Sequence, residues 1–72
     1  MDTVAAIDLT VNGDPLRVVD GMSVAGLLAQ LRLDRRKVAV ERNEEIVVRS
    51  TYEDTVLLAD DRLEIVHFIG GG

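Results

Sequence analysis

The chain has 72 residues, which suits one domain over residues 1–72, and it carries a formal net charge of −5 at pH 7. This acidic balance argues against nucleic acid or an anionic membrane as the partner, and it favours a protein partner with a basic docking face. The absence of cysteine excludes a disulfide, a thiolate metal site and a thiol nucleophile, and a single histidine argues against any protein metal site.

The first elements of the chain predict a β-hairpin. Residues 7–11 alternate between apolar and polar side chains, and this period of two is typical of a strand with one buried face. Asn12-Gly13 supplies the positive φ angles that a tight turn needs, and residues 16–19 resume as a second strand.

A helix is predicted next. Ser23 can accept a hydrogen bond from a free N–H group of the first turn, so it is the expected N-cap. One apolar stripe with i, i+3, i+4 and i+7 spacing follows it, formed by Val24, Leu27, Leu28 and Leu31. We expect this stripe to pack on the sheet.

The second half of the chain predicts several short elements. Asp34 to Lys37 is a charged connector, which we interpret as a solvated loop, with a docking role left open. The elements after it are a third strand at 38–41, a turn at 43–45, a short fourth strand at 46–48, a helical turn with Ser50 as its candidate cap, and a last strand at 63–68.

This order of elements predicts an α+β fold of the β-grasp type, with one helix covering a mixed sheet of four to five strands. The first and last strands would lie side by side in its middle. No stretch reaches the roughly 18 apolar residues of a membrane span. Residues 1–6 lack the basic and apolar regions of a signal peptide, so we expect a cytoplasmic protein.

The last strand runs directly into Gly70, Gly71 and Gly72. Glycine has no Cβ, so its backbone can approach other groups closely, and three extended residues reach about 10 Å. We predict that residues 69–72 form a flexible tail that carries the terminal carboxylate into the active site of another protein.

The ionisable residues do not predict an active site in this chain. The adjacent acids Asp60-Asp61 and Glu44-Glu45 lie in predicted turns, where acids are usually solvated. His67 is the one candidate general base, and it has no predicted partner. The glycines precede no helix that could bind phosphate. We therefore expect neither catalytic residues nor a bound cofactor.

An exposed apolar patch is predicted on the last strand. Val66 and Phe68 share one face with Glu64 and would lie beside Ala39 if the third strand is the neighbour. Clustered exposed apolar groups mark contact sites, so these three apolar residues are our predicted docking surface. A shift in register of one residue would instead bury Val66 and Phe68 in the core.

From residue 7 onward the sequence resembles the ThiS family, the sulfur carriers of thiamine biosynthesis, which have a ubiquitin-like β-grasp fold. The stretches that carry the resemblance are Val11-Asn12-Gly13, Val24 to Leu31, Val38-Ala39-Val40-Glu41-Arg42-Asn43, Arg49-Ser50, and Asp61 to Phe68 with the glycines. The family often has proline at position 48 and glycine at position 60, where this chain has Val48 and Asp60.

The resemblance implies a protein co-substrate. An ATP-dependent adenylyltransferase would join AMP to the Gly72 carboxylate, and sulfur from a cysteine desulfurase would convert it to a thiocarboxylate. Thiazole synthase would then receive the sulfur. Gly70 and Gly71 would thread into the partner, and Ala39, Val66 and Phe68 would dock. ATP would be used by the activating enzyme, with no cofactor bound to the carrier itself.

Three other functions remain open from the sequence. The small subunit of molybdopterin synthase would share the fold and the tail chemistry, although a Pro-Pro segment before the glycines is missing here. A ubiquitin-like modifier would form an isopeptide bond through Gly72. A docking module would not need Gly72 at all.

Overall fold

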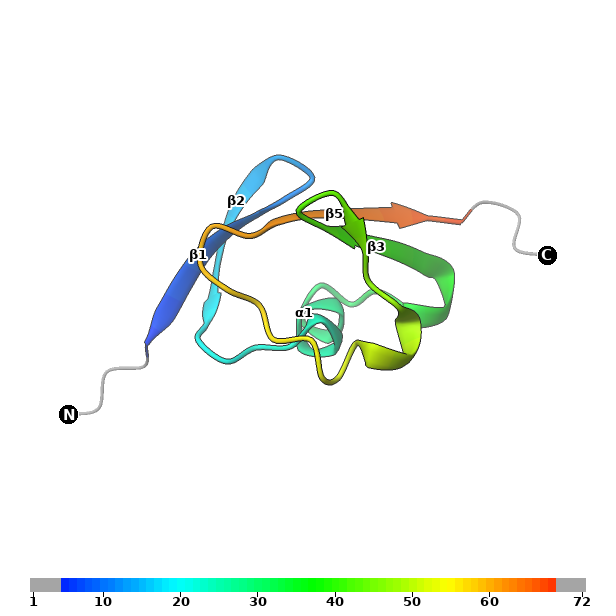
Figure 1. Ribbon diagram of the computed structural model, residues 1–72, viewed down its shortest axis with the longest axis horizontal. Coiled ribbons are helices and arrows are strands. Elements are labelled where there is room, and N and C mark those ends of the chain that lie inside the picture. Colours follow the sequence, from blue (N-terminus) through cyan, green and yellow to red (C-terminus); the bar gives the residue numbers. More distant parts are fainter. Residues whose placement is uncertain (1–4, 69–72) are drawn as a thin grey trace.

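The computed structural model describes residues 5–68, which form a five-stranded mixed sheet with one α-helix against one of its faces (Figure 1). The strands lie in the order β2-β1-β5-β3-β4. The elements are β1 (Ala6–Val11), β2 (Asp14–Val19), α1 (Val24–Gln30), the 3-10 helix η1 (Arg35–Lys37), β3 (Val38–Arg42), β4 (Glu45–Ile46), the 3-10 helix η2 (Arg49–Thr51) and β5 (Arg62–His67). The predicted α+β architecture of the β-grasp type is confirmed.

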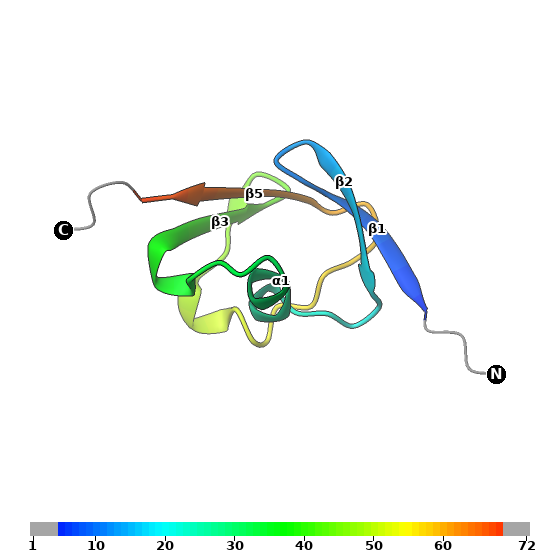
Figure 2. The ribbon, with the colours of Figure 1, turned by 180° about the vertical axis from the view of Figure 1, so that it is seen from behind.

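The first and last strands lie side by side in the sheet, as the sequence predicted. β1 pairs with β5 in parallel through Thr10 with Arg62 and Val11 with Leu63. β5 also pairs antiparallel with β3 from Leu63 to His67. Figure 2, seen from behind, shows β5 crossing the molecule above α1. β5 is therefore held between two strands at its start, and its end leads away from the body.

Local sequence signals explain the hairpin and the start of the helix. Asn12 and Gly13 have φ angles of 51° and 85°, the positive values that a two-residue hairpin turn requires. The Ser23 hydroxyl accepts a hydrogen bond from the Gly26 N–H at 3.0 Å, so the predicted N-cap is confirmed. The helix ends at Gln30, and Leu31 is its half-buried C-cap.

The core lies between the sheet and α1. It contains the predicted helix residues Val24, Leu27 and Leu28 and the inward residues of the strands. It also contains Tyr52 and Leu57, whose side chains are 1% and 0% exposed. Both belong to the long connection between β4 and β5, which has no periodic pattern in the sequence.

Three sequence-based expectations were wrong in this connection and near it. The fourth strand covers only Glu45–Ile46, because the chain leaves the sheet to form η2. Ser50 does not cap the helical turn: the N-cap position is Val48, without a side-chain hydrogen bond. Asp61 is buried, not solvated.

Asp61 is buried because it satisfies several donors at once. Its carboxylate accepts hydrogen bonds from the Asn43 side chain at 3.0 Å and from the Leu58 N–H at 2.9 Å. It also forms a 3.1 Å ion pair with Arg42. Asp60, by contrast, is exposed and has a φ of 69°, the left-handed conformation that aspartate tolerates better than most residues.

Candidate functional site

The end of β5 carries the predicted docking residues. Leu63 and Ile65 are buried, and they alternate with the exposed Glu64 and Val66. Since β-strand side chains alternate between faces, Val66 lies on the face away from α1. The register pairs Val66 with Ala39, as the sequence predicted. The alternative register, with Val66 and Phe68 in the core, is excluded.

Phe68 follows the last residue of β5 and is still tied to the sheet. Its backbone N–H donates a 2.9 Å hydrogen bond to the Lys37 carbonyl. Its side chain is 51% exposed and that of Val66 is 56% exposed, while Ala39 is half-buried. The Arg49 guanidinium carbon lies 5.9 Å from the centroid of the Phe68 ring, within the range of a cation–π contact. The three predicted docking residues thus form one partly apolar surface at the end of β5.

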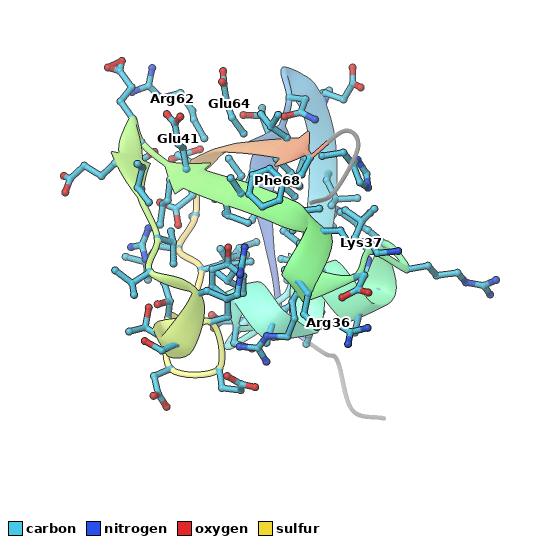
Figure 3. All side chains as sticks on the ribbon, turned by 90° about the vertical axis from the view of Figure 1, so that its right-hand side faces the viewer. Arg36, Lys37, Glu41, Arg62, Glu64 and Phe68 are labelled. Atoms are coloured by element: carbon cyan, nitrogen blue, oxygen red, sulfur yellow. The ribbon has the colours of Figure 1, made fainter. Side chains whose placement is uncertain are left out.

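Charged side chains surround this surface. Glu41 and Glu64 are directly opposite each other on β3 and β5. In Figure 3 they lie with Arg62 on the side of the sheet away from α1, and Phe68 lies between them and the pair Arg36 and Lys37. Like charges on directly opposed residues repel one another, and a basic group on a partner would relieve this repulsion.

The connector before β3 is ordered by its own charges. The Arg36 guanidinium and the Arg36 backbone N–H both donate to the Asp34 carboxylate and lower the pKa of Asp34 to about 2. The neighbouring Arg35 forms an ion pair with Glu53 that lowers the pKa of that carboxyl group. Two of the three basic residues of 34–37 are therefore paired within the chain, and the segment forms the 3-10 helix η1 where the sequence predicted a loop.

Two asparagine side chains position β5, and the sequence analysis assigned them only to turns. The Asn12 side chain accepts from the Ile65 N–H at 2.8 Å and donates to the Ile65 carbonyl at 3.2 Å. The Asn43 side chain accepts from the Arg62 N–H at 2.8 Å. Both asparagines have positive φ, of 51° and 52°. The only sequence signal for this role was an asparagine in each predicted turn. The distant backbone groups that these side chains bind could not be predicted from the sequence.

The described residues offer no constellation for catalysis of their own. No group of three or more possible metal ligands lies within residues 5–68. A surface hollow of about 430 Å³ is lined by residues of β4, η2 and their neighbours, and Glu45 is its one carboxylate. No helix among residues 5–68 is long and apolar enough to cross a membrane. Gly70, Gly71 and Gly72, the predicted threading and modification residues, lie outside the described residues.

The fold and the exposed end of β5 define a ubiquitin-like β-grasp domain, and the comparisons narrow this class to one family. The model of the ThiS family matches residues 9–72. The crystal structure of the thiamine biosynthesis protein (ThiS) from Geobacter metallireducens is similar, with a TM-score of 0.79 and 35% identity; the match covers 92% of this chain and 100% of that one.

Curated relatives agree. The sulfur carrier protein ThiS of Bacillus subtilis is 43% identical over 53 residues, which cover 74% of this chain and 80% of that protein. A thiazole synthase of Magnetococcus marinus is 51% identical over 61 residues, which cover 85% of this chain and 19% of that enzyme. The chain thus spans about a fifth of the length of the thiazole synthases it matches. The chain belongs to the ThiS family.

Proposed function

We propose that the chain, as one carrier domain over residues 1–72, carries sulfur as a thiocarboxylate on Gly72 and delivers it to a thiazole synthase. The observation that carries the proposal is the position of the exposed surface of Ala39, Val66 and Phe68, which ends four residues before the terminal Gly72. The chain has no cysteine, so its terminal carboxylate is the group available to hold sulfur. Membership of the ThiS family supports the same function.

The chemistry needs an activated carboxylate. The Gly72 carboxylate attacks the α-phosphorus of ATP on an adenylyltransferase and releases pyrophosphate. The acyl adenylate that forms has AMP as a good leaving group. The terminal sulfur of a cysteine desulfurase persulfide displaces AMP, and a thiol then cleaves the acyl disulfide to leave the thiocarboxylate. The folded domain supplies docking and reach, and the partner enzymes, which we place with it in the cytoplasm, supply the catalysis.

Intact-mass measurement tests this function. Incubation with ATP, cysteine, a cysteine desulfurase and the cognate adenylyltransferase should add about 16 Da, the difference between oxygen and sulfur at the terminus. The thiocarboxylate form should then support thiazole formation by the thiazole synthase. Appearance of the chain on lysines of other proteins would indicate a modifier, and transfer of sulfur to a pterin would indicate the molybdopterin pathway.

Removal of Gly72 is the sharpest control. The variant should lose sulfur transfer while its melting temperature stays near that of the full chain, because the last described residue that bonds to the sheet is Phe68. Thiazole formation supported by the shortened chain would refute the proposal. A large fall in melting temperature would mean that the terminus has a structural role.

A further inference from the structure

The second half of β5 has a neighbouring strand on only one side. On the β1 side, Arg62 and Leu63 pair with β1. The Asn12 side chain then forms hydrogen bonds with both the N–H and the C=O of Ile65, where a neighbouring strand would otherwise do so. Beyond Ile65 no described segment continues this side, whereas β3 still pairs on the other side as far as His67. β5 therefore changes from a central strand to an edge strand at Ile65.

The backbone of His67 faces this open edge. The Phe68 N–H points toward β3, because it donates to the Lys37 carbonyl at 2.9 Å. Successive residues of a strand direct their backbone groups to opposite sides, so the N–H and C=O of His67 point away from β3. Those of Ile65 point the same way, toward Asn12. His67 thus presents one donor and one acceptor with the spacing of a sheet edge.

This edge has none of the usual protection. Natural edge strands are commonly blocked by lysine, by proline or by a bulge. The stretch Val66-His67-Phe68 contains none of these, and the side chains of Val66 and Phe68 are half exposed or more. An unblocked edge flanked by apolar side chains is suited to the addition of an extended segment from a partner.

We propose that an extended segment of the activating enzyme adds to β5 as a strand and pairs with the backbone of His67. This inference rests on the proposed function. Gly72 lies five positions after His67, a span of roughly 17 Å at most. An enzyme that acts on the terminal carboxylate therefore has its active site within about 17 Å of this edge, close enough for one of its segments to reach the edge. Pairing at His67 fixes the direction in which the terminus enters the enzyme.

Proline substitution tests the role of the backbone. His67→Pro removes the N–H donor that faces the open edge and leaves the ladder to β3 intact, since proline is tolerated where the N–H faces outward. Binding to the adenylyltransferase, measured by calorimetry, should weaken about tenfold, the effect of one lost interface hydrogen bond with its partner left unpaired. His67→Ala keeps the N–H, so it measures the contribution of the side chain to binding. The loss of affinity in His67→Ala should be clearly smaller than in His67→Pro.

Val19→Pro is the matched control. The Asp20 N–H donates to the Ala5 carbonyl, so by alternation the N–H of Val19 faces the outer edge of β2. This variant carries the same substitution at an outward-facing N–H of a different edge, and it should bind the enzyme like the unmodified chain. Equal losses for Val19→Pro and His67→Pro would show a general effect of proline and would overturn the inference.

Amide hydrogen exchange provides a measurement without substitution. The His67 amide should exchange rapidly in the free chain and be protected in the complex with the adenylyltransferase. An unprotected His67 amide in the complex would overturn the proposal. So would a dimer of the free chain that His67→Pro dissociates, because the edge would then belong to a second copy.

The outcome can be separated from that of the proposed function. If the 16 Da gain occurs in the unmodified chain but His67→Pro binds normally, the edge inference is wrong and the carrier function stands. If the unmodified chain gains no sulfur with any partner, the carrier function itself is wrong.

Discussion

The side chain of Asn12 and the backbone of Ile65 form two hydrogen bonds between residues that are 53 positions apart in the sequence. Asn12 is at the hairpin turn, where β1 leaves the sheet, and Ile65 is in the middle of β5. The amide uses one of its N–H groups as donor and its oxygen as acceptor, with the spacing of a peptide group, so it replaces the next residue of a strand. The Asn12 side chain thus continues the hydrogen bonding of β5 past the end of β1, toward the docking surface.

Replacement of Asn12 should destabilise the fold. Asn12→Ala leaves the N–H and C=O of Ile65 unpaired and places alanine at positive φ, so we expect a loss of roughly 2–4 kcal/mol in the free energy of unfolding. Asn12→Gly removes only the hydrogen bonds, since glycine accepts positive φ, and should lose about 1–3 kcal/mol. Urea unfolding measures both. Stability of Asn12→Gly equal to that of the unmodified chain would show that the two bonds contribute nothing.

The buried carboxylate of Asp61 should be the most sensitive acidic position. Asp61→Ala leaves Arg42, the Asn43 amide and the Leu58 N–H without their acceptor, and we expect a loss of about 3–5 kcal/mol. Thermal unfolding provides the measurement. The adjacent Asp60→Gly is the control: it removes an exposed acid and relieves a positive φ of 69°, so it should leave stability unchanged or raise it. Similar losses at the two positions would contradict the assignment.

The connector before β3 should contribute to the pH dependence of stability. Because Arg36 lowers the pKa of Asp34 to about 2 in the folded chain, this pair stabilises the fold above the unfolded pKa of about 3.9. Its contribution is lost as the pH falls from about 4 through about 2. In Asp34→Asn the urea midpoint should change less with pH over this window. Its dependence on pH near neutrality should be the same as in the unmodified chain. If Asp34→Asn loses stability at low pH as steeply as the unmodified chain, other carboxylates dominate the acid sensitivity of the fold.

Repulsion between the directly opposed Glu41 and Glu64 should lower the stability of the free chain. Glu64→Lys replaces repulsion by attraction across the β3–β5 pair and should raise the free energy of unfolding by about 0.2–1 kcal/mol. The same variant should bind a partner with a basic docking face less tightly. The gain should shrink at high salt, because exposed charges are screened. A gain independent of salt would point to packing instead of charge.

Phe68 should matter more for binding than for folding. Its side chain is 51% exposed, so Phe68→Asp should change the melting temperature little while it weakens binding to the adenylyltransferase and the thiazole synthase. Leu58→Asp is the matched control, because Leu58 is 57% exposed but lies near the start of β5, at its other end from Phe68. Gross unfolding of Phe68→Asp would place the ring in the core.

The sequence by itself determined the elements that depend on near neighbours. The alternation of residues 7–11, the Asn12-Gly13 turn, the Ser23 cap and the apolar stripe of α1 involve contacts a few positions apart. These signals, with the order of the elements, were sufficient for the β-grasp fold. The pairing of Ala39 with Val66 was an expectation beside an alternative register, and the sheet of the folded chain decides it.

Only the tertiary structure decided the features that join distant segments. Three features depend on which segments meet in space. They are the burial of Tyr52 and Asp61, the hydrogen bonds between Asn12 and Ile65, and the open edge at His67. Asp61 illustrates the reason: the Leu58 N–H is a near neighbour, but its other two partners, Arg42 and Asn43, come from β3 and the turn after it and are brought to Asp61 by the sheet. Burial and backbone satisfaction are properties of the assembled sheet, so no local pattern in the sequence encodes them.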